Sequence, residues 1–238
     1  MRYLDFAKLE ALDPAAYQTR HPYPWLNPEG LLTPEGYEAL HLGLPDLSLF
    51  KGHFGVNRKA GQGPHDRYTL EYRDDTPVPR PWGEFLEELR GERYKRALCR
   101  LVGIRNLDLN FHWHYTPNGC SVSPHCDSKR KLGSHIFYFN TEKDWKPEWG
   151  GETVILDDRG RFRMRSAPSF EDFDAAESST ALGNHSLIFT RHGNSWHGVR
   201  EIHCPEDAMR RVFIVVLNRA DPFYRLRSKL SGKGFERY

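Results

Sequence analysis

The sequence predicts a mainly β fold, in the form of a sandwich, jelly roll or barrel, with α-helices contributed by the amino-terminal half. Two observations support this class. Between residues 107 and 218, several short segments alternate apolar and polar residues or run continuously apolar, and loops rich in Gly, Asn, Asp and Pro separate them. Before residue 105, apolar residues instead recur at helical spacing or lie in irregular stretches. A chain of 238 residues is long enough for one large domain, and we expect a single domain.

Composition narrows the possible classes. The chain is 38% hydrophobic and 28% charged, which is typical of a folded soluble protein. A net charge of +2 gives no support for a nucleic-acid partner. No apolar run is long enough to span a membrane, and the first residues contain acids where a signal peptide would be apolar, so we expect a cytoplasmic protein without a membrane partner. The few cysteines, which form no CxxC pair, are expected to be free thiols: Cys99, Cys120, Cys126 and Cys204.

The amino-terminal part, up to about residue 80, is rich in Pro, Gly and aromatic residues and is interpreted as an irregular segment that wraps the core. A short helix is predicted after Thr33-Pro34-Glu35, since Thr is a good helix cap and Pro fits the first turn. From Pro81 to about Leu101, apolar residues recur near helical spacing between charges. This pattern predicts one amphipathic helix that lies against a sheet.

After about residue 105, the repeat of apolar residues changes from helical spacing to every second residue. In residues 107–116, LDLNFHWHYT, Phe111, Trp113 and Tyr115 alternate with His112 and His114. Further strands are predicted at residues 134–140, 152–156, 186–190 and 211–218. The polar, aperiodic residues 157–180 between them are expected to form a long surface loop.

Three residues form a candidate metal site. His125 and Asp127, in SPHCDS, are two apart, so on an extended strand their side chains point to the same face. His197, in GNSWHGV, follows a predicted strand and its turn-rich loop. Two imidazoles and one carboxylate form the facial triad that suits non-haem Fe(II) and leaves positions open for O2 and substrate.

A co-substrate pocket is predicted from the last strong strand. Oxygen chemistry of this type uses a keto acid, whose far carboxylate needs a fixed cation, ideally the fork of an arginine. Arg210 and Arg211 begin that strand, and alternation points one of them inward. Arg210 would share its face with Val212, whereas Arg211 would share its face with the larger Phe213. This favours Arg210 slightly and leaves Arg211 as the alternative.

The order of motifs resembles the prolyl 4-hydroxylase-like branch of the Fe(II)/2-oxoglutarate dioxygenases. The motifs are YTPNGCSVSPHCD, SHIFYFNTEKDW, GGETVI, SLIFT, NSWHGV and RRVFIVV, and they cover roughly residues 107–220. The resemblance implies a double-stranded β-helix (jelly roll) with flanking α-helices from the amino-terminal half. It divides the single domain into a helical and irregular wrapping segment at 1–105, a jelly-roll core at 106–220 and a C-terminal tail at 221–238.

The resemblance also implies residue roles. Tyr115, ten residues before His125, occupies the position of a family tyrosine that lines the co-substrate pocket. Tyr138 occupies the position of another, which helps the basic residue to bind the 2-oxoglutarate carboxylate. Alternation agrees that Tyr138 can face the pocket. The Gly150-Gly151 pair corresponds to a family turn before a strand.

The resemblance further implies an oxygenase that uses Fe(II), 2-oxoglutarate and O2, and that hydroxylates a small molecule or a protein or peptide side chain. 2-Oxoglutarate would be converted to succinate and CO2. Two other classes remain as alternatives: a cupin-like metalloenzyme that does not use 2-oxoglutarate, and a non-catalytic jelly-roll binding module. The substrate is not indicated by the sequence.

Other polar residues are expected to have structural roles. Strand alternation places His112 and His114 opposite Phe111, Trp113 and Tyr115, which we expect to turn both histidines away from the metal. Arg67 and Tyr68 could reach a substrate from the wrapping segment, although an edge strand explains them equally well.

Overall fold

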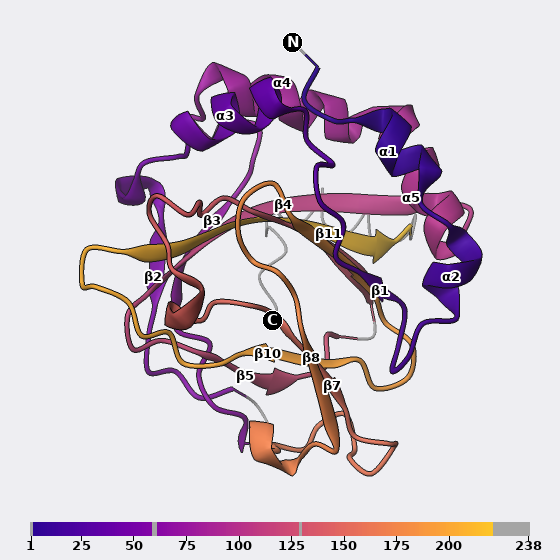
Figure 1. Ribbon diagram of the computed structural model, residues 1–238, viewed down its shortest axis with the longest axis vertical. Coiled ribbons are helices and arrows are strands. Elements are labelled where there is room, and N and C mark those ends of the chain that lie inside the picture. The colour runs from indigo at the N-terminus through magenta and orange to yellow at the C-terminus, as the bar shows by residue number, and fades with distance from the viewer. Residues whose placement is uncertain (1, 59–60, 129, 221–238) are drawn as a thin grey trace.

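Two antiparallel β-sheets face each other in the computed structural model, which describes residues 2–58, 61–128 and 130–220 (Figure 1). The larger sheet has the strand order β1-β9-β6-β11-β4-β3-β2, and the smaller has the order β5-β10-β7-β8. The larger sheet consists of β1 (Trp25–Leu26), β2 (Lys51–His53), β3 (Arg67–Glu71), β4 (Leu107–Pro117), β6 (Lys131–Tyr138), β9 (Ser186–Thr190) and β11 (Met209–Arg219). The smaller consists of β5 (Val122–His125), β7 (Val154–Asp157), β8 (Ala175–Ser178) and β10 (Trp196–Val199). The predicted jelly-roll class is confirmed.

The helices come from the amino-terminal half and cover the outer face of the larger sheet (Figure 1). Thr33 caps the predicted short helix by accepting a hydrogen bond from the Gly36 N–H at 3.1 Å. The single helix predicted at 81–101 is two helices, because Gly91 adopts an extended conformation between them. The helices are α1 (Phe6–Ala11), α2 (Pro14–Gln18), α3 (Pro34–Leu42), α4 (Arg80–Arg90) and α5 (Glu92–Val102), with short 3-10 helices at Leu47–Leu49, Pro147–Trp149 and Phe170–Asp172.

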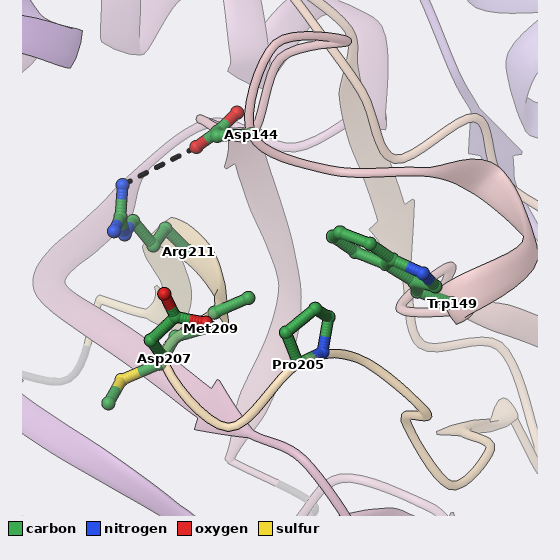
Figure 2. A pocket seen from close by; sticks show the side chains of 7 residues that line it. Asp144, Trp149, Pro205, Asp207, Met209 and Arg211 are labelled. Atoms are coloured by element: carbon green, nitrogen blue, oxygen red, sulfur yellow. Dashed lines mark hydrogen bonds and ion pairs between the residues drawn. The ribbon is translucent and has the colours of Figure 1, made fainter.

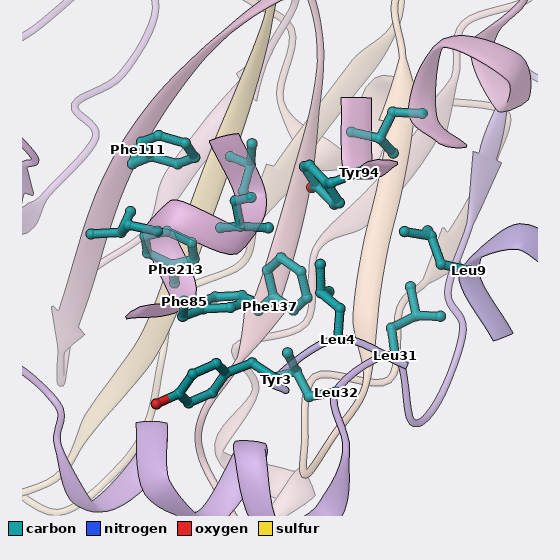
Figure 3. Close-up of a cluster of buried hydrophobic side chains, with 14 of the residues drawn as sticks. Tyr3, Leu4, Leu9, Leu31, Leu32, Phe85, Tyr94, Phe111, Phe137 and Phe213 are labelled. Atoms are coloured by element: carbon teal, nitrogen blue, oxygen red, sulfur yellow. The ribbon is translucent and has the colours of Figure 1, made fainter. Parts of the chain in front are cut away.

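The main hydrophobic core lies between these helices and the larger sheet. Figure 3 shows Phe85 of α4 among Phe111, Phe137 and Phe213 of three adjacent strands. All four rings are buried, and burial of each contributes about 1.5–3 kcal/mol relative to exposure. Because core residues occupy alternate positions, aromatic on β4 and mostly aliphatic beside Phe213 on β11, this core fixes which face of each strand turns outward.

The opposite, inner face of the larger sheet looks toward the smaller sheet. In the strand register, Val212 is the direct partner of both His114 on β4 and Tyr138 on β6, so these side chains share the inner face. A second hydrophobic cluster fills this space and joins the two sheets, since it includes Tyr138 and Val212 from the larger sheet and Ile155 from β7. A site built on the smaller sheet therefore faces the inner residues of β4, β6 and β11.

The predicted strands form close to their expected positions, and 186–190 coincides with β9. The loop expected at 157–180 is only partly a loop, because it contains β8, whose residues pair with β7. β8 is exposed along its length, which explains why hydrophobic patterning missed it. The tail expected at 221–238 lies outside the described residues. No described helix has the length and apolar character needed to cross a membrane.

Candidate metal centre and co-substrate pocket

His125, Asp127 and His197 come together at the inner face of the smaller sheet. His125 ends β5, His197 lies on β10, and the two are direct partners in the strand register. Asp127 follows two residues after His125, and its Oδ2 lies 3.9 Å from His197 Nε2. One ligand atom from each of the three lies within 4.8 Å of the others, and all three residues are buried or nearly so. The structure thus brings together the residues that spacing alone had singled out.

Both imidazoles are oriented by the backbone of their own strands. His125 Nδ1 lies 2.9 Å from the Ser123 carbonyl oxygen, and His197 Nδ1 lies 2.9 Å from the Ser195 carbonyl oxygen. A carbonyl only accepts hydrogen bonds, so Nδ1 carries the proton in both rings. Nε2 is then left with its lone pair, as a metal ligand requires.

The electrostatics hold the three residues in the protonation states that bind metal. Burial lowers the pKa of His125 and His197, so both rings stay neutral near pH 7. Burial by itself would raise the pKa of Asp127, but Lys131 and the two histidines hold it below its usual range. Lys131 Nζ lies 3.0 Å from Asp127 Oδ2. Lys131 donates its hydrogen bond to the other carboxylate oxygen, Oδ1, at 3.1 Å, so the buried Oδ2 has an ion-pair contact but no hydrogen bond to a described residue and can bind a metal ion.

The donor set fits iron. Two imidazole nitrogens and one carboxylate oxygen match the facial triad of non-haem Fe(II) sites, in which the remaining positions are open to small ligands. A structural zinc site would instead close with four ligands, and Cys126, between the two ligands of the HxD motif, packs with Trp196 in another hydrophobic cluster.

Arg210 lies on the inner face, opposite the smaller sheet. Its guanidinium is buried and donates hydrogen bonds from Nε to the Gly151 carbonyl oxygen and from an Nη to Thr153 Oγ1 at 3.3 Å. It also lies 5.6 Å from the centre of the Tyr138 ring. Burial lowers its pKa, and no described carboxylate is within ion-pair distance. A buried cation with only neutral partners is an unsatisfied anion site.

Arg211 points the other way. Figure 2 shows it at an outer pocket with Asp144, whose Oδ2 lies 3.4 Å from Arg211 Nη1. Trp149 and Pro205 line the same pocket, whereas the triad does not. Of the two arginines that the sequence left open, Arg210 is therefore the one that faces inward.

Two further polar atoms beside Arg210 lack partners. Thr116 is the direct neighbour of Arg210 on β4, and its buried hydroxyl forms no hydrogen bond to a described residue. The buried Nε2 of His114 forms none either. Tyr138 on the other side donates its hydroxyl proton toward Thr153 Oγ1 at 3.0 Å and lies 2.8 Å from Ser179 Oγ. These inner-face residues therefore offer a cation, hydroxyls and an imidazole, which suit the carboxylate and keto oxygens of 2-oxoglutarate.

Tyr115 is not among these inner-face residues, and the role expected for it is corrected. Its ring lies on the outer face, stacked 4.2 Å from Phe50, and its hydroxyl donates to the Pro45 carbonyl oxygen at 3.1 Å. The expectation for His112 and His114 is reversed as well, because both lie on the inner face. Alternation separates the two faces correctly but does not tell which one is inner. The helices pack against the aromatic face of β4, so His112 and His114, on the opposite face, are turned toward the site.

Three residues near the triad were missed by sequence reasoning. Lys131 pairs with Asp127, while His65 and Arg58 reach the site from the wrapping segment, with the His65 ring 4.3 Å from that of His125. Arg67, weighed earlier, lies on β3, and its Nη1 donates to the His65 carbonyl oxygen at 2.9 Å. Lys131 is only four residues from Asp127, and this spacing was the one local signal available; His65 and Arg58 had none, because contacts with β5, some 60 residues away, bring them to the site.

Comparison with known proteins agrees with this geometry. Residues 111–217 match the family model of the 2OG-Fe(II) oxygenase superfamily. No curated protein matches the chain.

Among solved structures, the chain resembles a prolyl-4-hydroxylase from Pseudomonas putida, with 14% identity and a TM-score of 0.61, over 90% of this chain and 100% of that one. It also resembles a prolyl hydroxylase from Trichoplax adhaerens, with 12% identity and a TM-score of 0.63, over 96% and 94%. The 2-oxoglutarate-dependent carbocyclase SnoK of nogalamycin biosynthesis matches with 11% identity and a TM-score of 0.61, over 90% and 86%.

The matched residues include the whole His-Asp-His triad, all of β6 and most of β4 and β11. Residues 111–217 belong to the 2OG-Fe(II) oxygenase superfamily, and the protein is a non-haem iron oxygenase that uses Fe(II), 2-oxoglutarate and O2.

Proposed function

We propose that the protein is a hydroxylase in which His125, Asp127 and His197 hold Fe(II), and Arg210 binds the far carboxylate of 2-oxoglutarate. The observation that carries the proposal is the buried Arg210 guanidinium, which faces the triad's sheet and has no carboxylate partner among the described residues. A cupin-like enzyme that does not use 2-oxoglutarate would have no need of this cation.

Each residue of the site has a separate task. The Ser123 and Ser195 carbonyls fix the two imidazoles with Nε2 free to bind the metal. Gly151 and Thr153 hold Arg210 in place, and the neighbouring Tyr138 closes one side of the carboxylate site. Fe(II) bound with 2-oxoglutarate supplies the activation of O2 that couples formation of succinate and CO2 to substrate oxidation. The protein residues position the metal and the keto acid relative to each other for this reaction.

The substrate is proposed to be a small molecule or a protein or peptide side chain. The Trichoplax adhaerens structure holds a peptide fragment, and SnoK acts in nogalamycin biosynthesis. These two proteins of the same fold support keeping both a peptide and a small molecule as substrate classes. Hydroxylation is the outcome proposed here because the Asp127 carboxylate is present to occupy the third protein position on the metal.

The direct test is succinate formation. Purified protein with Fe(II), 2-oxoglutarate and air is expected to release succinate slowly without a primary substrate. Asp127→Ala is expected to release none, whereas Cys126→Ala, which changes the residue between two ligands, should behave as wild type. Succinate release that persists in Asp127→Ala, or wild-type protein that binds both Fe(II) and 2-oxoglutarate yet releases none, would contradict the proposal.

A further inference from the structure

The segment that precedes β3 is fastened to the strand that carries the metal ligand. His65 forms an isolated bridge with Val122 of β5, and Ser123 Oγ donates to the Gly63 carbonyl oxygen at 3.0 Å. Gln62, which is buried, donates from Nε2 to the Ser166 carbonyl oxygen at 2.9 Å, and so ties the segment to the loop before β8. These contacts hold the wrapping segment against the triad.

His65 orients an arginine at this position. Arg58 Nη1 lies 3.0 Å from His65 Nε2, and because a guanidinium only donates, His65 must accept through that nitrogen. A histidine that accepts a hydrogen bond through one ring nitrogen carries a proton on at most the other, so His65 is a neutral partner of Arg58. The backbone of Arg58 is held too, since its N–H donates to the Gln62 carbonyl oxygen at 3.0 Å.

Arg58 lies close to the triad, because the ring of its partner His65 is centred 4.3 Å from the ring of the ligand His125. Its guanidinium is partly buried, and within the described parts of the chain no carboxylate lies at ion-pair distance from it. The exposed arginines Arg93 and Arg200, in contrast, pair with Glu10 and Glu171. A partly buried cation whose one side-chain partner is neutral is costly unless an anion binds to it.

Iron and co-substrate do not supply that anion. The two positive charges of Fe(II) are balanced by the two negative charges of 2-oxoglutarate, and Lys131 pairs with the Asp127 carboxylate. Arg210 and Arg58 then remain as an excess of two positive charges, and since Arg210 is assigned to the far carboxylate of 2-oxoglutarate, Arg58 is the one of these cations to which no anion is assigned. Arg58 still has N–H groups that His65 does not use, and these can form the paired hydrogen bonds that bind a carboxylate or phosphate.

We propose that the primary substrate carries an anionic group, a carboxylate or a phosphate, and that Arg58, held by His65, binds this group beside the metal. This inference rests on the proposed function, since it assigns a substrate class to the same site. Lys131 adds positive charge to the same region, and the wrapping segment thereby determines specificity.

The test uses the magnetic relaxation that Mn(II) causes in nearby nuclei. Wild-type protein is loaded with Mn(II) and 2-oxoglutarate under nitrogen, so no turnover occurs. Inorganic phosphate is added in one arm and acetate in the other, and the relaxation of their ³¹P and methyl ¹H nuclei is measured. The concentration dependence of each enhancement gives the dissociation constant of that anion, and the lower constant identifies the preferred anion. Four proteins are compared: wild type, Arg58→Gln, Arg58→Lys and the control Arg200→Gln, which removes an exposed, paired arginine.

Arg58→Gln is expected to weaken binding of the preferred anion about tenfold or more, because a charged hydrogen-bond donor is lost. Arg58→Lys should retain part of the binding, and Arg200→Gln should match wild type. Equal enhancement in wild type and Arg58→Gln, with Mn(II) and 2-oxoglutarate still bound, would overturn the inference and leave the proposed function intact. Failure of wild type to bind Mn(II), seen by electron paramagnetic resonance, would overturn both.

Discussion

Arg210 and Arg211 are consecutive in the chain and lie on opposite faces of the larger sheet. Arg210 is buried on the inner face beside Tyr138, whereas Arg211 is on the outer face and pairs with Asp144 (Figure 2). The two residues have the same chemistry and differ only in the face that β11 gives them. They therefore form a matched pair for testing where 2-oxoglutarate binds.

Arg210→Gln is expected to weaken 2-oxoglutarate binding strongly, since it removes a buried charged partner of a carboxylate. A loss of about 2–4 kcal/mol corresponds to a roughly 30- to 1,000-fold weaker affinity. Arg211→Gln should change the affinity by less than about twofold, because that side chain faces the outer pocket. Calorimetric titration of the Mn(II)-loaded proteins with 2-oxoglutarate measures both. Equal effects of the two substitutions would place the carboxylate elsewhere.

Gly151 keeps Arg210 in position. Its φ is +97°, and a Cβ added there would lie 3.2 Å from Arg210 Cδ and 3.3 Å from a carbon of the Trp145 ring. Gly151→Ala is therefore expected to displace Arg210 and to weaken 2-oxoglutarate binding by about tenfold. Gly150→Ala is the control, since Gly150 also has a positive φ, of +81°, but its Cβ would meet nothing closer than 3.6 Å. Both variants should lose stability, and only the first should lose affinity.

The two tyrosines should separate binding from stability. Tyr138→Phe removes a buried hydroxyl on the inner face and is expected to weaken 2-oxoglutarate binding several-fold. Tyr115→Phe removes the hydrogen bond to the Pro45 carbonyl oxygen, which should cost about 1 kcal/mol of unfolding free energy and leave the affinity unchanged. Urea unfolding and calorimetry together check this. A large affinity loss in Tyr115→Phe would restore the role that the family resemblance implied for it.

Acid should destabilise the fold through buried histidines. His135 lies on the outer face, with Nδ1 2.8 Å from the Tyr94 hydroxyl, and burial lowers its pKa to about 3. The unfolded chain takes up the proton near pH 6.5, so the stabilising contribution is complete above that pH and is lost as pH falls toward 3. Within that window, His135 contributes about 1.4 kcal/mol per pH unit to the slope of the unfolding free energy against pH.

His135→Gln should reduce the slope of unfolding free energy against pH between 4.5 and 6. Phe137→Leu, at a non-titrating ring 4.0 Å from His135, should lower stability at every pH and keep the wild-type slope. Urea unfolding at several pH values measures the slopes. An unchanged slope in His135→Gln would show that this ring is protonated in the folded protein.

Much of the site could be predicted because its ligands carry local signals. His125 and Asp127 are two residues apart on one strand, and His197 follows a strongly apolar strand, so pattern and spacing place all three. The position of Tyr115 could not be predicted, because alternation defines two faces and only the packing of the helices decides which is inner. His65 and Arg58 carry no local signal, since their roles depend on contacts with β5 some 60 residues away.

The fold shows the same division. Strands with apolar or alternating patterns form where expected, but Gly91 splits one predicted helix, and the exposed β8 has no hydrophobic pattern to reveal it. β8 exists because its backbone pairs with β7, and side chains contribute little to that pairing. Local patterning therefore finds buried elements and misses those held by backbone hydrogen bonds alone.

The central claim is that the triad and Arg210 together hold iron and 2-oxoglutarate. The most direct test is an anaerobic titration of the purified protein with Fe(II) and 2-oxoglutarate, followed through the weak visible charge-transfer band of the chelated complex. Wild type should show the band only when both are present, His125→Ala should show none, and Arg210→Gln should require far more 2-oxoglutarate. A wild-type protein that binds Fe(II) but shows no band at any 2-oxoglutarate concentration would contradict the account.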